Sequence, residues 1–492
     1  MSNNEYLRNK TLGGIFWKGL ERVLAQVVST VVSIILARLL LPEDYGIVSI
    51  VLIFFSFCNI FITSGLSTAL IQKKEADSLD YSTTLYANFA FATTLYLILF
   101  FCAPFIEKLF NQNDLTIVLR IMGIMLFVNG YKSIVSAKIS SDLQFRKFFF
   151  STLIGTVVSA VVGIVMAVND CGVWALVAQQ MTNSVVDALV LTITTKLQIS
   201  FSFSIRRFAN LFKYGGKLIV SGLINETYNQ ITPLVIGLRF SSAELAFYAK
   251  GRMYPQLISS TANDTLSSSL FPVMSKAQDD KDLILKMTRR FMQMSSFFVF
   301  PLMIGFLAVS ESFVLVVLTE KWLPIVPYLI IFCVAYMFSP IQTGNLQAIK
   351  AIGKSNVFLL LEVIKKTLYT AILVCFIIFI KDPVYLAVSA IITSLLASLI
   401  NSFPNKKLLN YGYKKQFLDL APNLITAVIM GCIVYFMKYI QINNIVLLIL
   451  QVFVGIIVYF LLNYLIKNKS LAYLIDLFKT VTSRKKTEAH NE

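Results

Sequence analysis

The sequence contains little of what a soluble protein needs on its surface or an enzyme needs in its active site. Of its 492 residues only 14% are charged, and there is a single histidine. A soluble domain carries roughly a quarter charged residues, so this chain cannot cover a globular surface with polar groups. The histidine, His490, lies in the polar C-terminal stretch. This position argues against a metal centre or a histidine general base.

Cysteine is also sparse and shows no functional spacing. The six cysteines form no C-x-x-C pair; they are Cys58, Cys102, Cys171, Cys333, Cys375 and Cys432. Nearly all lie inside apolar runs, where cysteine acts as a small core residue, so we expect neither disulfides nor a cysteine metal site. The phosphate-binding pattern G-x-x-x-x-G-K-[ST] is absent as well. We therefore expect no nucleotide and no other cofactor apart from a coupling ion, H⁺ or Na⁺.

Apolar residues, in contrast, are in large excess. Hydrophobic residues make up 57% of the chain and the mean hydropathy is +0.74, which predicts an integral membrane protein. The formal net charge of +17 does not indicate nucleic acid, because the basic residues lie in short loops between apolar runs. The polar opening "MSNNEYLRNK" is followed by no small-residue cleavage site. We therefore expect the first apolar run to stay in the mature protein.

The apolar runs predict an all-α polytopic protein with about fourteen transmembrane helices, since a span needs about 20 largely apolar residues. The predicted spans are 13–40, 44–71, 81–103, 115–137, 148–169, 172–195, 210–238, 244–272, 287–310, 325–348, 355–380, 383–403, 420–440 and 443–466. Lys and Arg are concentrated in every second loop, as in the loops that hold Lys73 and Lys406. Since basic short loops stay in the cytoplasm, this alternation supports the number of spans and places both termini inside.

Nine basic residues lie within the predicted spans, where a charge that faces lipid costs about 2.5–3.5 kcal/mol on insertion scales. They are Lys18, Arg22, Arg120, Lys132, Lys217, Lys250, Arg252, Lys365 and Lys366. Two of them begin polar stripes that repeat along the chain. The first stripe is Lys18, Arg22, Gln26, Ser29 and Ser33; the second, 199 residues later, is Lys217, Ser221, Asn225, Tyr228 and Thr232.

Both stripes have the spacing 4, 4, 3, 4, which keeps their members on one face of a helix. The turns that follow also correspond, because "LLLPEDYGIVS" precedes "RFSSAELAFYA" by 200 residues. Two halves of six spans in the same orientation are implied. We expect the two stripes to face each other across a water-filled cavity, which avoids the cost of charges in lipid. For Lys18, near the cytoplasmic end, extension to the lipid headgroups is the alternative.

The eighth and eleventh spans carry further charges. Lys250 and Arg252 are candidates for the cavity, although their position near the outer end also allows extension to the headgroups. Lys365 and Lys366 accompany Glu362, so an internal ion pair is as plausible as ligand contact. The intramembrane acids that suit proton or Na⁺ coupling are Asp264, Glu226 and Asp187. For Asp187 a structural hydrogen bond is the competing interpretation.

Several segments together resemble the polysaccharide-export branch of the MOP superfamily, which comprises Wzx-type oligosaccharide flippases and teichuronic-acid-type exporters. They are "ARLLLPEDYGIVS", "SGLSTALIQKKEAD", "FRKF", "GVWALVAQQ", "FKYGGKLIVSGLIN", "FPVMSKAQDD" and "NLQAIKAIGKSN". The likeness extends over about residues 10–410. It implies a bacterial cytoplasmic (inner) membrane protein whose two six-helix lobes form a V around a central cavity, with two C-terminal accessory helices.

The resemblance implies the domains 1–205 (N-terminal lobe), 206–410 (C-terminal lobe), 411–467 (accessory helices) and 468–492 (cytoplasmic tail). It further implies alternating-access transfer of undecaprenyl-pyrophosphate-linked oligosaccharide to the outer leaflet, for O-antigen, capsule or exopolysaccharide synthesis. Membrane lipid, a polysaccharide polymerase and other assembly proteins would be partners. Related peptidoglycan-precursor flippases place cations on the first, second and eighth helices. The second span here has no basic residue in its body, which departs from that pattern.

Two other functions stay open at this point. A polysaccharide polymerase, ligase or glycosyltransferase would need catalytic groups at the outer face, where the loops are short and contain no histidine. A multidrug/cation antiporter of the same superfamily would need an acidic cavity, whereas Lys and Arg dominate within these spans. A purely structural role would leave the duplicated stripes unexplained. The sequence therefore favours a transporter of an anionic substrate over an enzyme.

Overall fold

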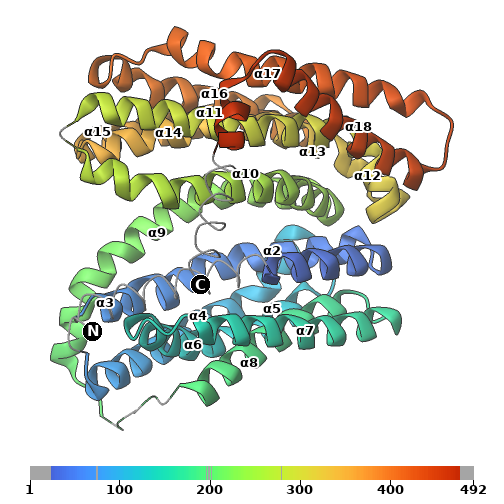
Figure 1. The fold of residues 1–492 in the computed structure, drawn as a ribbon. Coiled ribbons are helices and arrows are strands. Elements are labelled where there is room, and N and C mark those ends of the chain that lie inside the picture. The colour runs from blue at the N-terminus through green and yellow to red at the C-terminus, as the bar shows by residue number, and fades with distance from the viewer. Residues whose placement is uncertain are drawn as a thin grey trace, which may run out of the picture. The chain divides into compact units, whose positions relative to one another are not determined.

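The computed structural model describes residues 24–73, 76–195, 197, 200, 202–278 and 280–476. Throughout this part of the chain the regular structure is helical, with no β-strand (Figure 1). Among the described residues, ten helices are long and apolar enough to cross a membrane. The other predicted spans are also helical: Leu24–Leu39, α9 (Ile205–Arg239), α10 (Ser242–Lys276) and α15 (Ser355–Phe379). The prediction of an all-α polytopic membrane protein is confirmed.

The chain divides into two compact units, Met1–Ala246 and Phe247–Glu492. The first unit contains the helix Leu24–Leu39 and, after it, α2 (Pro42–Asn59), the π-helix η1 (Ile60–Gly65), α3 (Leu66–Gln72), α4 (Ser78–Phe110), α5 (Leu115–Gly123), α6 (Met125–Ser141), α7 (Arg146–Val168), α8 (Val173–Thr194) and α9. These are the blue to light-green elements of Figure 1. The lobes 1–205 and 206–410 remain a proposal.

The second unit continues from α10, which begins shortly before its boundary. It contains α11 (Lys281–Ala308), α12 (Ser310–Phe313), η2 (Val314–Leu318), η3 (Glu320–Ile325), α13 (Val326–Met337), α14 (Ser339–Ala351), α15, α16 (Pro383–Leu408), α17 (Tyr413–Phe436), η4 (Met437–Tyr439) and α18 (Asn444–Leu465). Helices α2 and α10 begin 200 residues apart. This agrees with the repeat inferred from the turns that precede them.

The fourth and tenth predicted spans each consist of consecutive helices that form one apolar span, Leu115–Ser141 and Glu320–Ala351. The fourth divides at Ile124 between α5 and α6, and the tenth divides at Phe338 between α13 and α14. Both junction residues have right-handed helical backbone, so each span continues across its junction. Pro340, near the start of α14, lacks an N–H. Gly123, beside the first junction, lies against Tyr96, whose ring would be 2.6 Å from an added Cβ atom.

A close backbone contact fixes the second span to the seventh. An added Cβ atom on Gly65, at the end of η1, would lie 2.6 Å from Ile219 Cδ1 of α9. An added Cβ atom on Gly215 would in turn lie 2.8 Å from the Gly65 carbonyl carbon. Only glycine allows this approach without a shift of one helix. The contact places η1 directly against α9.

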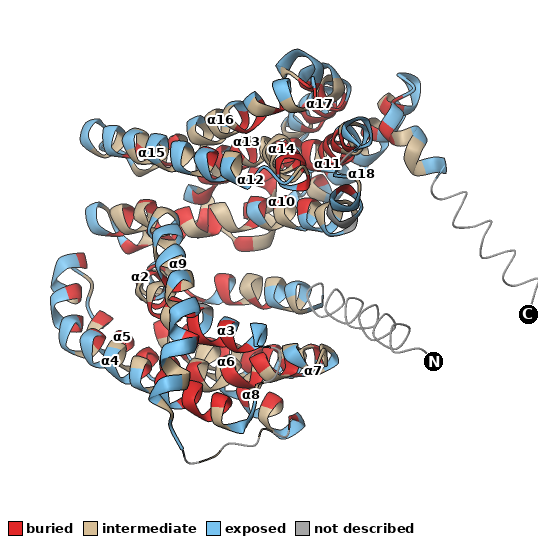
Figure 2. Cartoon of the chain, turned by 90° about the vertical axis from the view of Figure 1, so that its left-hand side faces the viewer, coloured by how far each residue is buried: buried red, intermediate tan, exposed pale blue. Residues whose placement is uncertain are grey.

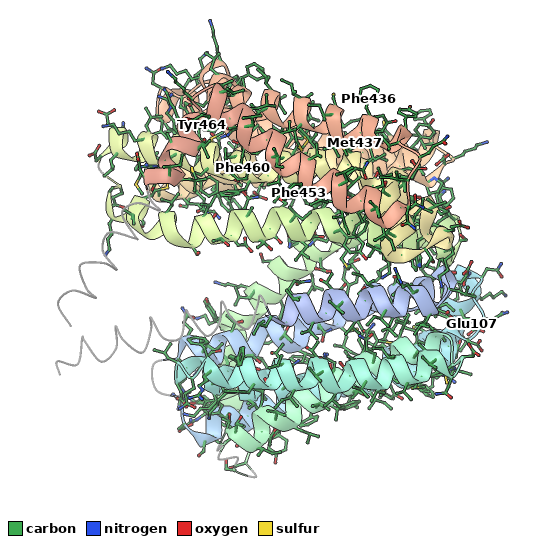
Figure 3. All side chains as sticks on the ribbon, turned by 45° about the vertical axis from the view of Figure 1, so that its right-hand side comes forward. Glu107, Phe436, Met437, Phe453, Phe460 and Tyr464 are labelled. Carbon is green, nitrogen blue, oxygen red and sulfur yellow. The ribbon has the colours of Figure 1, made fainter. Side chains whose placement is uncertain are left out.

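Helix α18 exposes apolar side chains and buries polar ones, as expected of a helix that faces lipid. Phe453 and Tyr464 are 61% and 69% exposed, and Figure 3 shows their side chains on the outer side of the helix. Gln451 and Asn463 are fully buried against α17, where Gln451 Nε2 donates to the Val434 carbonyl at 3.1 Å. Figure 2 shows the same mixture of exposed and buried positions along the spans. Polar groups inside and apolar groups outside are what a hydrocarbon environment requires.

Candidate functional site

The charged start of the first stripe lies outside the described residues, so Lys18 and Arg22 have no structural account. The next two members, Gln26 and Ser29, are exposed on the helix Leu24–Leu39. Gln26 Nε2 donates to Thr30 Oγ1 at 3.5 Å, and Thr30 Oγ1 donates to the Gln26 carbonyl at 2.7 Å. The side chains of Gln26 and Ser29 are therefore exposed on the surface of this helix.

The second stripe lies on α9, away from the face that packs against η1. Lys217, Ser221 and Asn225 are exposed, and Tyr228 is partly buried. The packed face contains Gly215 and Ile219, which are both buried. These residues lie on a different side of the helix from the stripe because successive positions rotate by about 100°. Thr232, the last member of the stripe, is buried, so only the first part of the row is exposed, and the predicted cavity between the two stripes stays a prediction.

Lys250 and Arg252 of α10 have markedly different surroundings from the exposed stripes. Lys250 is only 5% exposed, and its Nζ lies 5.2 Å from the centre of the Trp322 ring, a cation–π distance. Its amine is therefore held within the protein and does not extend to a headgroup layer.

The guanidinium of Arg252 lies among phenol groups. Its Nε donates to Tyr336 Oη at 3.4 Å, and Tyr248 and Tyr369 are close enough to interact with its charge. Within the described part of the chain, no carboxylate forms an ion pair with it. Arg252 thus presents a planar set of N–H donors whose charge is not neutralised by a described acid. Such a group suits a phosphate or pyrophosphate ligand.

Asp264 and its neighbour Asn263 differ in burial on α10. Asp264 is exposed, whereas Asn263 is 5% exposed and lies on the packed side of α10. Asn263 Nδ2 donates to Ser339 Oγ at 2.9 Å, and Ser295 Oγ donates to Asn263 Oδ1 at 2.8 Å. These groups connect α10 to α14 and α11. Asn263, Ser295 and Ser339 are therefore used in helix packing.

The other intramembrane acids are in polar contacts. Asp187 of α8 forms an ion pair with Lys132 of α6, with 3.0 Å between Oδ2 and Nζ. Glu226 accepts a hydrogen bond from Gln230 at 2.7 Å within α9. Glu362 and Lys365 form an ion pair within α15. An internal ion pair was one of the two alternatives that the sequence offered for these charges. No group of three or more His, Cys, Asp or Glu among the described residues could hold a metal ion.

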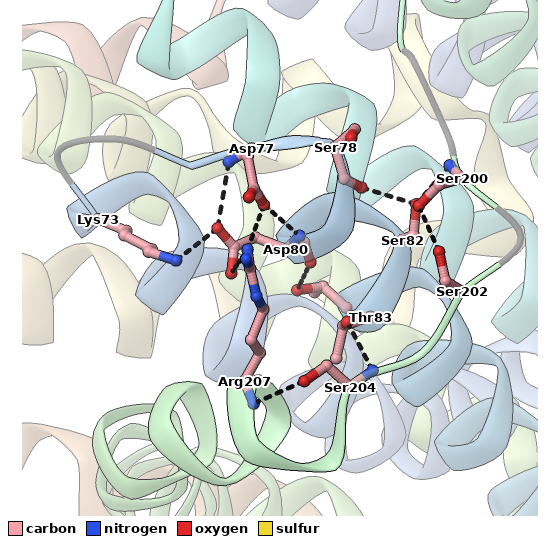
Figure 4. A network of polar contacts seen from close by, with 11 residues as sticks. Lys73, Asp77, Ser78, Asp80, Ser82, Thr83, Ser200, Ser202, Ser204 and Arg207 are labelled. Carbon is pink, nitrogen blue, oxygen red and sulfur yellow. Dashed lines mark hydrogen bonds and ion pairs between the residues drawn. The ribbon is translucent and has the colours of Figure 1, made fainter.

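A polar network that the sequence did not single out joins the start of α9 to the start of α4 (Figure 4). Asp77 caps α4 by accepting from the Asp80 backbone N–H at 2.9 Å, and Arg207 forms ion pairs with both acids. Lys73 bonds the other oxygen of Asp80, whose side chain is only 1% exposed. The hydrogen bond from Arg207 holds the pKa of Asp77 well below its usual range. The backbone N–H of Ser204 donates a hydrogen bond to Thr83 Oγ1 at 3.2 Å.

The sequence does contain one signal for this network. Asp77 and Asp80 are three residues apart, directly before the apolar run of α4, which is the pattern of a reciprocal helix cap. The partner Arg207 lies 130 residues away, and no local pattern identifies it. The network fixes the segment that leads into α9 onto the first unit.

This architecture defines a class, a polytopic α-helical membrane protein with two helical units and cationic groups within its spans. The polysaccharide biosynthesis protein family matches residues 35–327, more than half of the sequence, so the chain belongs to this family. The polysaccharide-export resemblance seen in the sequence is thereby confirmed.

Known proteins with similar sequences carry related names. The lipopolysaccharide biosynthesis protein WzxC of Escherichia coli (strain K12) is 22% identical over 427 residues, covering 84% of this chain and 85% of WzxC. The succinoglycan biosynthesis transport protein ExoT of Rhizobium meliloti (strain 1021) is 23% identical over 288 residues, or 58% of each chain.

Among solved structures, the lipid II flippase MurJ in an inward closed conformation has a similar fold. Its TM-score is 0.73 at 15% sequence identity, with 91% of this chain and 98% of MurJ covered. At this identity the likeness concerns the fold alone. It agrees with the polytopic helical architecture described above.

Proposed function

We propose that this protein is a flippase that moves lipid-linked oligosaccharide repeat units from the cytoplasmic to the outer leaflet for cell-surface polysaccharide synthesis. Membership of the polysaccharide biosynthesis protein family supports the pathway. The observation that carries the proposal is Arg252, a guanidinium in a membrane helix that is surrounded by tyrosines and not neutralised by a described acid. A charged group in this position points to an anionic ligand more strongly than to a purely structural role.

The chemistry of the substrate class fits this site. A pyrophosphate group carries negative charge that a low-dielectric membrane interior disfavours, and arginine offers it two parallel N–H donors. Lys250, two residues away, lies on another side of α10, buried against Trp322, so the proposed anion site rests on Arg252. The polar stripe Ser221, Asn225 and Tyr228 offers hydrogen bonds to sugar hydroxyls. Undecaprenyl-pyrophosphate-linked oligosaccharide is therefore the proposed substrate.

The proposal includes the direction and setting of transport. The excess of Lys and Arg in alternate loops supports cytoplasmic termini in the bacterial inner membrane. Alternating access of two helical lobes would carry the headgroup through the membrane, driven by a proton or sodium gradient. Asp264, Glu226 and Asp187 are the candidate coupling acids, and a polysaccharide polymerase is a candidate partner. No catalytic role is assigned to any residue.

The second candidate function is a multidrug/cation antiporter. It would need an acidic site for its cation, whereas Asp187 is neutralised by Lys132 and the α10 site is cationic. The charge distribution supports an anionic headgroup over a cationic drug. An enzyme of the same pathway is less well supported, because the outer loops contain no histidine.

The test is export of surface polysaccharide in the producing strain after deletion of the gene and complementation with variants. Arg252→Ala should reduce export at least tenfold, because charge-assisted hydrogen bonds contribute about 1.5–3 kcal/mol. Arg252→Lys should be partly active, since it keeps the charge and loses only the paired donors. Arg120→Ala is the matched control, because Arg120 lies on the Phe100 ring and donates to the Phe100 carbonyl at 3.3 Å.

Arg120→Ala should export normally at equal abundance in the membrane. Normal export by Arg252→Ala would contradict the proposed anion site. Equal loss in Arg252→Ala and Arg120→Ala would show that any spanning arginine is needed for folding, which would also remove the specific role of Arg252.

A further inference from the structure

A polar cavity of about 370 Å³ lies in the first unit, on spans that carry none of the predicted site residues. It is formed by the end of α2, η1 and α3 on one side and by α6 on the other. Its volume is within the range of small-molecule sites, about 300–1,000 Å³. The cavity is therefore large enough for a sugar residue.

The lining of the cavity consists of two rows of polar side chains. Asn59, Thr63 and Ser67 recur every four residues on the first wall, and Ser133, Ser136 and Ser140 recur at three and four residues on the second. Both spacings keep a row on one helical face. A membrane helix that gathers hydroxyl and amide groups on one face needs a polar surrounding for them. The two rows supply that surrounding to each other and to the space between them.

Some of these polar groups are fixed by hydrogen bonds between the walls. Asn129 Nδ2 donates to Asn59 Oδ1 at 3.1 Å, and Ser67 Oγ donates to Ser133 Oγ at 3.0 Å. Fully buried Asn88 of α4 donates to Ser133 Oγ at 2.9 Å from behind. The walls are therefore held in position before any ligand enters. This is the arrangement that lowers the cost of binding.

Other hydroxyls of the same lining are not used. The hydroxyl groups of Thr68, Ser136 and Ser140 form no hydrogen bond with another residue in the described part of the chain. Each hydroxyl can donate one hydrogen bond and accept two, as sugar hydroxyls also can. Thr68 lies on α3, and Ser136 and Ser140 lie in the last two turns of α6; α3 ends at Gln72 and α6 at Ser141. In the proposed topology, these are the cytoplasmic ends.

The charge of the cavity selects among polar ligands. Among the described residues of the lining, Lys132 is the only charged one, and Asp187 pairs with it at 3.0 Å. The pair has no net charge, so the cavity lacks the surplus positive charge that a pyrophosphate group requires. A metal ion would need several acidic or histidine ligands, and no such group exists among the described residues. A neutral polyhydroxylated ligand fits this set of groups.

The backbone beside the cavity is unusual in one respect. The second span changes from an α-helix to the π-helix η1 at Ile60–Gly65, and Thr63 of the lining belongs to this turn. Short π-helical turns inside α-helices occur frequently at functional sites. Here the turn is held from the other side by α9 through Gly65.

We infer that this cavity is a sugar-binding subsite, which takes a neutral sugar of the lipid-linked glycan as it loads from the cytoplasmic side. The inference rests on the proposed flippase function. The hydroxyls of α3 and α6 recognise the glycan. Glycan selectivity then resides in Thr68, Ser136 and Ser140.

Binding of two lipids to the purified full-length protein in nanodiscs tests the inference. The probes are bare undecaprenyl pyrophosphate and the lipid-linked glycan purified from the producing strain. The variant Thr68→Val/Ser136→Ala/Ser140→Ala removes three hydroxyls with little change in volume. We expect about tenfold weaker binding of the lipid-linked glycan and unchanged binding of the bare lipid, since each neutral hydrogen bond contributes modestly. Thr68→Ser/Ser136→Thr keeps the hydroxyls and should bind both lipids as the wild type does.

The possible outcomes distinguish a failure of the sugar-binding subsite from a failure of the flippase proposal. Unchanged binding of both lipids by the triple variant would show that the cavity holds only water and would overturn the inference. An equal loss for both lipids would also overturn it, because the effect would not depend on the sugar. If the wild type binds neither lipid, the flippase proposal fails and the subsite fails with it. Selective loss of the glycosylated lipid is the result that supports the subsite.

Discussion

The ion pair between Lys132 and Asp187 allows the cost of a charge within a span to be measured directly. Asp187→Asn removes the negative charge and keeps the shape of the side chain, whereas Lys132→Met removes the positive charge and keeps the apolar stem. Each single variant leaves one partner without its counter-charge. The double variant removes both charges and leaves neither unpaired. A double-mutant cycle therefore isolates the interaction.

The expected magnitude follows from the geometry. At 3.0 Å and an effective dielectric constant of about 20, two unit charges attract by about 5–6 kcal/mol before desolvation is subtracted. Removal of one partner from a buried pair costs about 3–5 kcal/mol. Lys132 is 30% exposed and Asp187 is 14% exposed, so part of the lost interaction is recovered by solvation. We expect each single variant to lower the free energy of unfolding by about 2 kcal/mol, with a coupling energy of about 1–2 kcal/mol.

The assay is unfolding of the purified protein in mixed detergent micelles, followed by circular dichroism. The pair Lys138 and Asp142 is the matched control, because its atoms are also 3.0 Å apart but both side chains are 32% exposed. Its coupling energy should be below about 0.5 kcal/mol, as for exposed helical pairs. A Lys132–Asp187 coupling no larger than this control would refute the reasoning. Export by the Lys132→Met/Asp187→Asn double variant would further exclude Asp187 as the coupling acid.

Three further predictions concern the other polar groups. Because Arg207 lowers the pKa of Asp77, their ion pair should stabilise the fold above pH about 4 and lose this effect as the pH falls below that value. The difference in melting temperature between the wild type and Arg207→Gln should therefore shrink at low pH. A constant difference from pH 3 to 7 would contradict this prediction. A cysteine at Asn225 should react with a polar thiol reagent in a background without native cysteines, whereas a cysteine at buried Ile219 should not, and equal labelling would refute the exposed stripe. Asp264→Asn should abolish the response of transport to an imposed ion gradient, and an unchanged response would remove Asp264 from coupling.

The sequence was informative about features that depend on composition and period. Hydropathy predicted the spans, and the 4, 4, 3, 4 spacing placed Ser221 and Asn225, both exposed, on one face of α9. The correspondence of turns 200 residues apart anticipated the starts of α2 and α10. These features are local, so a single sequence records them.

Features that depend on tertiary contact could not be predicted in the same way. The pairing of Lys132 with Asp187 joins residues 55 positions apart, and neither side chain has a local pattern that identifies the other. Asn263 and Asp264 are neighbours in the sequence, but one is buried between helices and the other is exposed. Hydropathy cannot assign such residues to a packed or an open side. The same reason explains why the cavity between α3 and α6 was not anticipated.

The most direct test of the central claim is transfer of the lipid-linked glycan between leaflets in proteoliposomes. The wild-type protein is reconstituted with the glycan lipid from the producing strain, and exposure of the glycan is followed with a membrane-impermeant glycosidase. We predict that the wild type moves the glycan across the bilayer and that Arg252→Ala does so at least tenfold more slowly. Protein that leaves the glycan in its original leaflet while exchanging a cationic drug for protons would contradict the account and identify an antiporter.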